Sequence, residues 1–336
     1  MDITTLKSDF YKRFDTSDNM LITQKSGILC TLLGFCDIRG STALSAPLSM
    51  GVTGVCRRLD GGAVKITDTS NGDIMTYYLS NFPLGQNFCG AQLLLDNAVP
   101  GYIDSTAAMR TCAIKCIMRV NGIDEFDKIS ACAVSCGKRN IKPYLALLEA
   151  KRGYAVFSHK LNTSLVPLPM TGYKYVLIQF SDKKFRTSSK DVERALNIIS
   201  NAFPHVTTFA DLNSETLRYA SSVLKSRKTV RRISYLMNET KRISCAVTVL
   251  KSMHTEALFD IINESAREYT ILWDSNKEIS TLLDFAASCD GVMAARPFEN
   301  GIVCIVDENM SDHITSAFSQ HLKYCLKNNI RFCISK

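Results

Sequence analysis

Residues 93–120 read LLLDNAVPGYIDSTAAMRTCAIKCIMRV, a segment in which a strand runs directly into a helix. Pro100 and Gly101 end the apolar strand, since neither residue favours a continued strand ladder. Asp104 or Ser105 is placed to cap the helix, because short polar side chains accept the free N–H groups of a first helical turn. Apolar residues recur behind the cap with helical spacing. The segment therefore predicts a helix over residues 104–120 that begins straight after a strand.

The sequence on either side of this segment predicts an α+β fold. Residues 21–98 carry short apolar or alternating runs broken by turn signals at Asp60-Gly61-Gly62 and Asn71-Gly72, a pattern typical of strands. Further helices are predicted at about 126–137, 143–151, 189–202, 212–224, 229–250, 254–268, 277–288 and 310–327. Further strands are predicted at about 154–158, 173–180, 292–296, 301–306 and 330–335. This order indicates mixed β-sheets packed with helices.

A lobe boundary is expected near residues 181–189, where charged residues collect with Ser and Thr. We therefore predict an N-terminal lobe over residues 1–185 and a C-terminal lobe over residues 186–336.

The composition is that of a globular protein with a sizeable core. The 336 residues are 46% hydrophobic and 21% charged, and no Gly/Ser-, Gln- or Pro-rich tract is present. No apolar run reaches the length of about 18 residues that a membrane helix needs. The N-terminal stretch MDITTLKSDFYKRF carries charges where a signal peptide needs an apolar run. We expect a cytoplasmic protein without a membrane partner.

The 13 cysteines are expected to pack as small apolar residues and not to bind a metal. Cys112 and Cys116, like Cys132 and Cys136, are four residues apart on predicted helices, which places each pair of thiols on one helix face. Zinc sites usually pair a C-x2-C with a second such pair or with two His residues, and neither pattern is present. No metal site is therefore predicted.

The net charge of +8 does not by itself indicate nucleic-acid binding. Basic residues cluster at 181–186 and 225–232, but interleaved aromatic residues of the kind that stack on bases are nearly absent there. We interpret both clusters as solvated helix faces. An acidic ligand such as a phosphate remains compatible with the charge.

Several segments, in this order, resemble galactokinases, members of the GHMP small-molecule kinase superfamily. LKSDFYKRFD (6–15) and GILCTLLGFCDIRGSTAL (27–44) resemble the family's N-terminal helix and its A-P-G-R-V-N-L-I-G-E-H-x-D-Y signature. LLLDNAVPGYIDSTAAM (93–109) resembles the strand that leads into P-x-G-x-G-L-S-S-S-A-A-L. Four later segments also follow the family pattern, namely KRGYAVFSHKLNTSLVPLP (151–169), RRISYLMNETKR (231–242), ALFDIINESAREY (257–269) and KEISTLLDFAASCDGVMAARPFENGIVCIV (277–306). The resemblance implies a two-lobed GHMP-kinase-like fold with an inter-lobe cleft.

The same resemblance implies that the residues for phosphoryl transfer have been replaced. Family members transfer the γ-phosphoryl group of ATP to a sugar hydroxyl, which depends on positioning and charge neutralisation. The family's catalytic Arg falls on Leu29, and its catalytic Asp falls on Pro143. Its Glu-His pair falls on Phe35-Cys36, and its sugar-binding Asp falls on Ile38. The remaining sugar-binding candidates are Cys36, Asp37, Arg39, Asn140 and Tyr144.

The family's phosphate loop corresponds to Tyr102–Met109, with Asp104, Ser105 and Thr106 as phosphate-loop candidates. Asp104 places a carboxylate where nucleotide phosphates approach in the family. The family's Gly-rich closing loop corresponds to the bulkier residues 295–301. Without reference to the family, Asp104 and Ser105 are interpreted as helix caps, and residues 37–40 as a turn with an exposed charge pair. Glu264 and Ser265 are assigned to helix packing and capping.

The sequence thus favours a galactokinase-like pseudokinase, inactive or strongly impaired, with a binding or regulatory role. Its ligand would be a sugar or another small molecule, or a protein partner, and nucleic acid is not expected. The alternative is an active ATP-dependent kinase for a galactose-type sugar with a rebuilt active site, and only this alternative implies ATP and magnesium as cofactors. A structural or oligomer-forming role is the third hypothesis.

Overall fold

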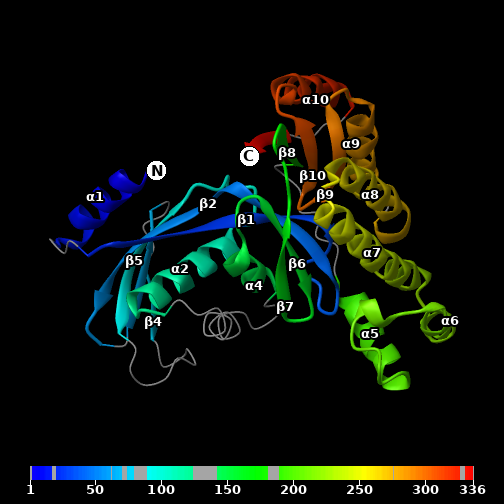
Figure 1. Cartoon of the computed structure of the whole chain (residues 1–336), viewed down its shortest axis with the longest axis horizontal. Helices are drawn as coiled ribbons and strands as arrows, with labels where there is room; N and C mark the ends of the chain where they lie inside the picture. Colours follow the sequence, from blue (N-terminus) through cyan, green and yellow to red (C-terminus); the bar gives the residue numbers. More distant parts are fainter. Residues whose placement is uncertain are drawn as a thin grey trace. The chain divides into compact units, whose positions relative to one another are not determined.

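A computed structural model describes residues 2–16, 20–61, 63–69, 74–78, 89–123, 142–180, 189–274, 276–325 and 330–335 (Figure 1). The chain divides into two units. The N-terminal unit consists of Met1–Leu29 and Leu48–Glu149, and the C-terminal unit consists of Cys30–Pro47 and Ala150–Lys336. The predicted boundary between residues 185 and 186 lies outside the described residues and stays a prediction.

The N-terminal unit combines antiparallel and parallel strand pairs with helices. Its elements are α1 (Ile3–Phe14), β1 (Ile22–Gly34), β2 (Ala43–Leu59), β3 (Ala63–Asp68), β4 (Ile74–Tyr78), β5 (Gly90–Asn97), α2 (Thr106–Val120) and α4 (Lys142–Glu149). The last residues of β1 and the first residues of β2 belong to the C-terminal unit. β3 pairs antiparallel with β4 and parallel with β5, which pairs antiparallel with β2. Leu6 and Phe10 of α1 pack against Val55 and Leu94 of this sheet.

The thiols of Cys112 and Cys116 lie on one face of α2, as the spacing predicts. A Cβ atom built on Gly54 of β2 would lie 3.0 Å from each of their Sγ atoms, so glycine makes room for both sulfur atoms. Both cysteines are buried and unbridged. In the parts of the chain that the structure describes, no cluster of His, Cys, Asp or Glu could hold a metal ion.

The C-terminal unit contains most of the helices in the described part of the chain. Its remaining strands are β6 (Tyr154–His159), β7 (Asn162–Pro167), β8 (Tyr173–Phe180), β9 (Val292–Phe298), β10 (Gly301–Asp307) and β11 (Ile330–Ser335). Its helices are α5 (Lys190–Ala202), α6 (Ser214–Val223), α7 (Arg227–Lys251), α8 (Thr255–Glu268), α9 (Lys277–Ser288) and α10 (Ser311–Cys325), with the short turns η2 (Phe209–Asp211) and η3 (Tyr269–Trp273). Among the described residues, no helix is long and apolar enough to cross a membrane.

A four-stranded antiparallel sheet, in the order β11-β8-β10-β9, packs against helices α8, α9 and α10 of this unit (Figure 1). Alternate residues of β8, β9 and β10 share a core with residues of α8, α9 and α10. Because side chains alternate across a strand, Ala295 of β9 joins this core while Arg296 points to the opposite face of the sheet. That face is also buried, since Arg296 is only 4% exposed.

The α+β prediction is confirmed, and most predicted elements lie within a few residues of the observed ones. Strand β7 was not predicted, and neither was η3, a π-helical turn that directly follows α8. The helix predicted at 126–137 lies outside the described residues.

Candidate functional site

The candidate site is the β1–β2 loop, residues 35–42, in the C-terminal unit. Gly34 has a φ of +72°, and a Cβ atom there would lie 2.1 Å from the carbonyl oxygen of Thr42, so only glycine fits. The loop closes where the Phe35 N–H donates to the Thr42 carbonyl oxygen at 3.3 Å. The Ser41 hydroxyl donates to the carbonyl oxygens of Ile38, at 2.8 Å, and of Phe35. These bonds give the loop a fixed shape that begins at Gly34.

Two loop side chains pack into the helical core of the unit. The Phe35 ring lies 4.4 Å from the Trp273 ring, centroid to centroid, and 6.1 Å from the Tyr235 ring. Ile38 is 2% exposed and belongs to a core that includes Val192 of α5. Phe35 and Ile38 stand where the family resemblance places the Glu of its Glu-His pair and its sugar-binding Asp. Those two positions therefore contribute to apolar packing.

The three sugar-binding candidates of this loop differ in exposure. Asp37 and Arg39 are exposed, as expected for the predicted turn, whereas Cys36 is buried. The backbone N–H of Arg39 donates to Glu193 Oε1 of α5 at 3.3 Å. The polar side chains that the loop presents to solvent are thus those of Asp37 and Arg39.

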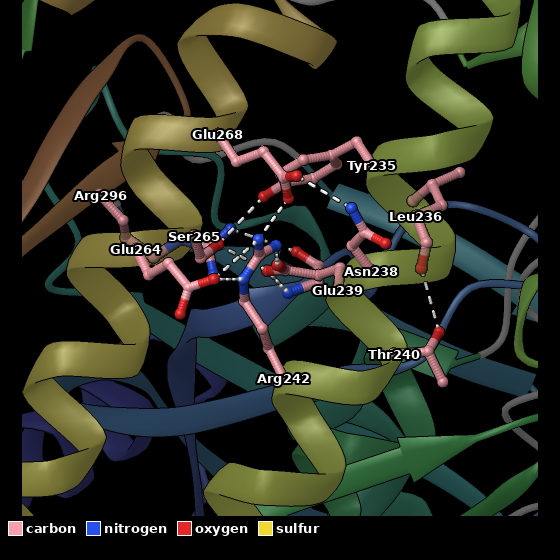
Figure 2. Close-up of polar contacts among 11 residues, drawn as sticks. Tyr235, Leu236, Asn238, Glu239, Thr240, Arg242, Glu264, Ser265, Glu268 and Arg296 are labelled. Atoms are coloured by element: carbon pink, nitrogen blue, oxygen red, sulfur yellow. Dashed lines mark hydrogen bonds and ion pairs between the residues drawn. The ribbon is translucent and has the colours of Figure 1, made fainter.

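A buried carboxylate holds the start of the loop. Glu239 of α7 is 1% exposed, and its Oε1 accepts the Gly34 N–H at 2.7 Å and the Ser265 hydroxyl at 2.8 Å (Figure 2). Its Oε2 accepts a hydrogen bond from Arg242 Nη1 at 3.1 Å. Tyr235 lies on the same helix, with its hydroxyl 3.1 Å from Ser265 Oγ. Burial, and then the charge of Glu239, raise the pKa of Tyr235 well above its usual value, so the phenol stays protonated.

Arg242 links Glu239 to the acidic end of α8. Figure 2 shows the Arg242 guanidinium among Glu239, Glu264 and Glu268. It forms ion pairs with Glu264, at 3.3 Å, and with Glu268, whose Oε1 accepts from Asn238 Nδ2 at 2.9 Å. Burial opposes the charge of Arg242, but the hydrogen bond to Glu268 and the charge of Glu239 outweigh it and raise the pKa of Arg242. Arg242 therefore remains a cation in this network.

A buried arginine of the sheet also contacts Gly34. Arg296 Nη2 of β9 donates to the Gly34 carbonyl oxygen at 3.2 Å, whereas its Nη1 is buried without a hydrogen-bond partner. Cys30 of β1 lies near the Arg296 charge, but burial dominates and raises the pKa of the Cys30 thiol to about 12. Cys30 is therefore an unreactive thiol at neutral pH.

The local sequence patterns did not predict this network. Glu264 and Ser265 were assigned to packing and capping. Ser265 instead donates a hydrogen bond to Glu239. The side chain of Glu264, which is 62% exposed, forms an ion pair with Arg242. One sequence signal was available, because Glu239 stands on the apolar face of α7, in helical register with Leu236 and Ile243. A carboxylate at such a position requires a buried partner.

The phosphate-loop candidates lie in the N-terminal unit, at the start of α2. Asp104 Oδ1 accepts the Thr106 N–H at 2.9 Å, which confirms the capping interpretation for Asp104. Ser105 precedes the first helical residue but makes no side-chain cap bond, because its hydroxyl accepts from Asn97 Nδ2 at 2.8 Å. One of the N–H groups at this helix start is therefore already bound to a carboxylate.

We expect the cap to have a measurable but small effect on stability. Asp104→Ala should lower the free energy of unfolding by about 0.5–1 kcal/mol, because the Thr106 N–H loses its acceptor. Asp104→Asn keeps a side-chain oxygen and should differ from the parent by only a few tenths of a kcal/mol. Urea denaturation followed by circular dichroism measures both. Equal losses in the two variants would contradict the capping role.

The other predicted site residues lie elsewhere in the N-terminal unit. Leu29 is half-buried on β1, and Pro143 lies in the first turn of α4. Tyr144 is buried, and its hydroxyl accepts from Arg110 Nη1 of α2 at 3.3 Å. Asn140 lies outside the described residues. Tyr144 is thus the one sugar-binding candidate found in the described part of this unit.

Known proteins share this fold. No protein-family model matches the chain. The galactokinase of Lactococcus lactis complexed with galactose superposes with a TM-score of 0.84 at 14% identity, covering 99% of this chain and 97% of that one. The mevalonate kinase of Methanococcus jannaschii superposes with a TM-score of 0.61 at 11% identity, covering 95% and 99%. The fold is that of the GHMP small-molecule kinases.

Two galactokinases are similar to the chain in sequence. The galactokinase of Thermosipho africanus is 24% identical over 248 residues, which cover 66% of this chain and 67% of that protein. The galactokinase of Halalkalibacterium halodurans is 22% identical over 235 residues, which cover 63% of this chain and 58% of that protein. Both relatives are galactokinases, the family that the motifs of this chain resemble.

Proposed function

We propose that this chain is a galactokinase-like protein with lost or strongly impaired phosphoryl transfer and with a binding or regulatory role. The observation that carries the proposal is the apolar packing of the β1–β2 loop. Ile38 is buried among helical core residues, and Phe35 packs on Trp273. A loop whose side chains at these positions fill the core has few polar groups left for sugar hydroxyls.

The residues at the family's catalytic positions support the same proposal. Leu29 and Pro143 carry no charge and no group that accepts a proton. Removal of a general base commonly slows a reaction by about 100- to 10,000-fold, and removal of a charge-stabilising group by about 100- to 1,000-fold. Losses of both kinds would leave little turnover, even though such effects are not additive.

The start of α2 also supports the proposal. A helix N-terminus binds phosphate through its free N–H groups and its dipole. Here the Thr106 N–H is bound to the carboxylate of Asp104, which would repel a phosphate. ATP binding in the family manner would have to displace this carboxylate.

We expect no significant ADP release from ATP and magnesium with galactose or with a panel of other hexoses. The test is a coupled ADP assay on the full chain, with the galactokinase of Lactococcus lactis as the positive control. Ordinary enzymes turn over at about 10 per second. A rate within about 100-fold of that value would overturn the proposal and establish the active sugar kinase instead.

Nucleotide binding is measured separately from turnover by thermal denaturation. A ligand that binds only the folded state stabilises it by about 2.7 kcal/mol at 100 times its Kd. We expect no shift of Tm with ATP and magnesium. A shift that Asp104→Ala increases would instead indicate a nucleotide site at the start of α2.

A further inference from the structure

We infer that Glu239 and Arg296 are positioning residues that fix the direction in which the β1–β2 loop leaves strand β1. Both act through the backbone of Gly34, and neither is among the family's catalytic or sugar-binding positions named above. Ligand binding by the positioned loop rests on the proposed function. The role of the two side chains in holding the loop does not depend on that function, so the two proposals can fail separately.

The geometry at Gly34 carries the inference. Its N–H belongs to the peptide group before its Cα atom, and this N–H donates to Glu239 Oε1 at 2.7 Å. Its carbonyl oxygen belongs to the peptide group after the Cα atom, and this oxygen accepts from Arg296 Nη2 at 3.2 Å. Fixing the peptide groups on both sides of one Cα atom fixes both of its backbone dihedral angles. Gly34 is therefore held at its left-handed φ by two side chains.

Both hydrogen bonds to Gly34 have a charged side chain as one partner. Hydrogen bonds to ionised groups are shorter and stronger than neutral ones, and a buried environment strengthens them further. Glu239 is 1% exposed and Arg296 is 4% exposed, so water competes for neither bond. A glycine has the largest backbone freedom of any residue, and this glycine needs an external constraint to keep one conformation.

The network around Glu239 keeps its carboxylate oriented. Oε1 faces Gly34 and Ser265, while Oε2 faces Arg242. A glutamine has one oxygen and one NH2 group, so it cannot accept on both sides. In Glu239→Gln, either the Gly34 N–H or the Arg242 guanidinium must face an NH2 group. Glu239→Gln can therefore keep the bond to Gly34, whereas Glu239→Met is similar in length and removes the acceptor of the Gly34 N–H.

Trp273 reports on the loop directly. It is the single tryptophan of the chain, it is 2% exposed, and its ring lies 4.4 Å from the ring of Phe35. Phe35 is the residue that follows Gly34. A change in the dihedral angles of Gly34 moves Phe35 and opens the environment of Trp273. Tryptophan emission and its quenching by acrylamide measure that change without any ligand.

The experiment compares the full-length parent with Glu239→Met. We expect a shifted emission maximum and a severalfold higher acrylamide quenching constant in the variant, with an unchanged far-ultraviolet circular dichroism spectrum. Glu264→Met is the matched control, because Glu264 binds the same Arg242 but is largely exposed and does not contact Gly34. It should quench like the parent. Parent-like quenching in folded Glu239→Met, or an equal change in Glu264→Met, would overturn the inference.

Arg296 is tested by a conservative and a non-conservative substitution. Arg296→Met removes the donor to the Gly34 carbonyl oxygen and should expose Trp273 as Glu239→Met does. Arg296→Lys keeps a cationic donor and should restore most of the parent quenching. If Arg296→Met folds and quenches like the parent, Arg296 does not position the loop.

One measurement needs no variant and covers the case in which the substitutions prevent folding. Hydrogen exchange of the parent should show the Gly34 amide protected as strongly as amides in the interior of β1, since its acceptor is a buried carboxylate. Fast exchange at Gly34 beside slow exchange in β1 would overturn the role of Glu239. None of these readouts uses ATP or a sugar, so detection of kinase activity would refute the proposed function and leave this inference standing.

Discussion

Gly34→Ala is expected to lower the free energy of unfolding by at least about 4 kcal/mol, a loss at the upper end of the range for point substitutions. The new methyl group would lie 2.1 Å from the Thr42 carbonyl oxygen and 2.9 Å from Ile243 Cδ1. The carbonyl oxygen is backbone, and it already accepts the Phe35 N–H, so it cannot move without opening the loop. Urea denaturation of parent and variant measures the loss.

Gly153→Ala is the matched control for this substitution. Gly153 has a φ of +82°, close to that of Gly34, but an added Cβ atom there meets nothing within 4 Å. Gly153→Ala should therefore lower the free energy of unfolding only by the penalty for a left-handed backbone, about 1–2 kcal/mol. Equal losses at Gly34 and Gly153 would show that the contact with Thr42 has no energetic consequence. An insoluble Gly34→Ala chain beside a soluble Gly153→Ala chain would agree with the expectation.

Arg242→Met is expected to cost about 3–5 kcal/mol, the usual loss when one partner of a buried ion pair is removed. Glu239 and Glu268 would each lose their cation, and Glu239 has no access to water that could replace it. The loss is measured by urea denaturation at neutral pH, where the carboxylates are ionised.

A double substitution separates charge from packing at this site. Adding Glu239→Gln to Arg242→Met removes the uncompensated buried charge, so the double variant should be less destabilised than the sum of the single losses. Glu264→Gln should change stability by no more than about 0.5 kcal/mol, because exposed ion pairs contribute little. Additive losses in the double variant would mean that Glu239 and Arg242 do not interact.

The elements predicted well are those with a strong local pattern. Helix α7 was predicted at 229–250 and spans Arg227–Lys251, because its apolar residues recur with helical spacing over many turns. Strand β7 was missed because NTSLVP is short and mostly exposed, and it exists through its pairing with β6. The turn η3 was missed because YTILW continues the pattern of the helix before it.

The network at Gly34 could not be predicted from local patterns, since its members are far apart in sequence. Gly34 and Glu239 are separated by 205 residues, and Gly34 and Arg296 by 262 residues. The family resemblance pointed to the β1–β2 loop and predicts that its polar positions have changed. It could not indicate that Ile38 enters the core, because that depends on packing against α5 and η2.

The distance in sequence between Gly34 and its two partners has a consequence for protein synthesis. Ribosomes extend a chain at about 5–20 residues per second. The 262 residues that separate Gly34 from Arg296 therefore take roughly 13 to 52 seconds to translate. Throughout that interval Gly34 lacks at least one of its two buried contacts, and nascent residues 35–42 present Phe35 and Ile38 without their complete core. A chaperone that shields short apolar segments on the ribosome would find this stretch available early and concealed only after Arg296 has been synthesised.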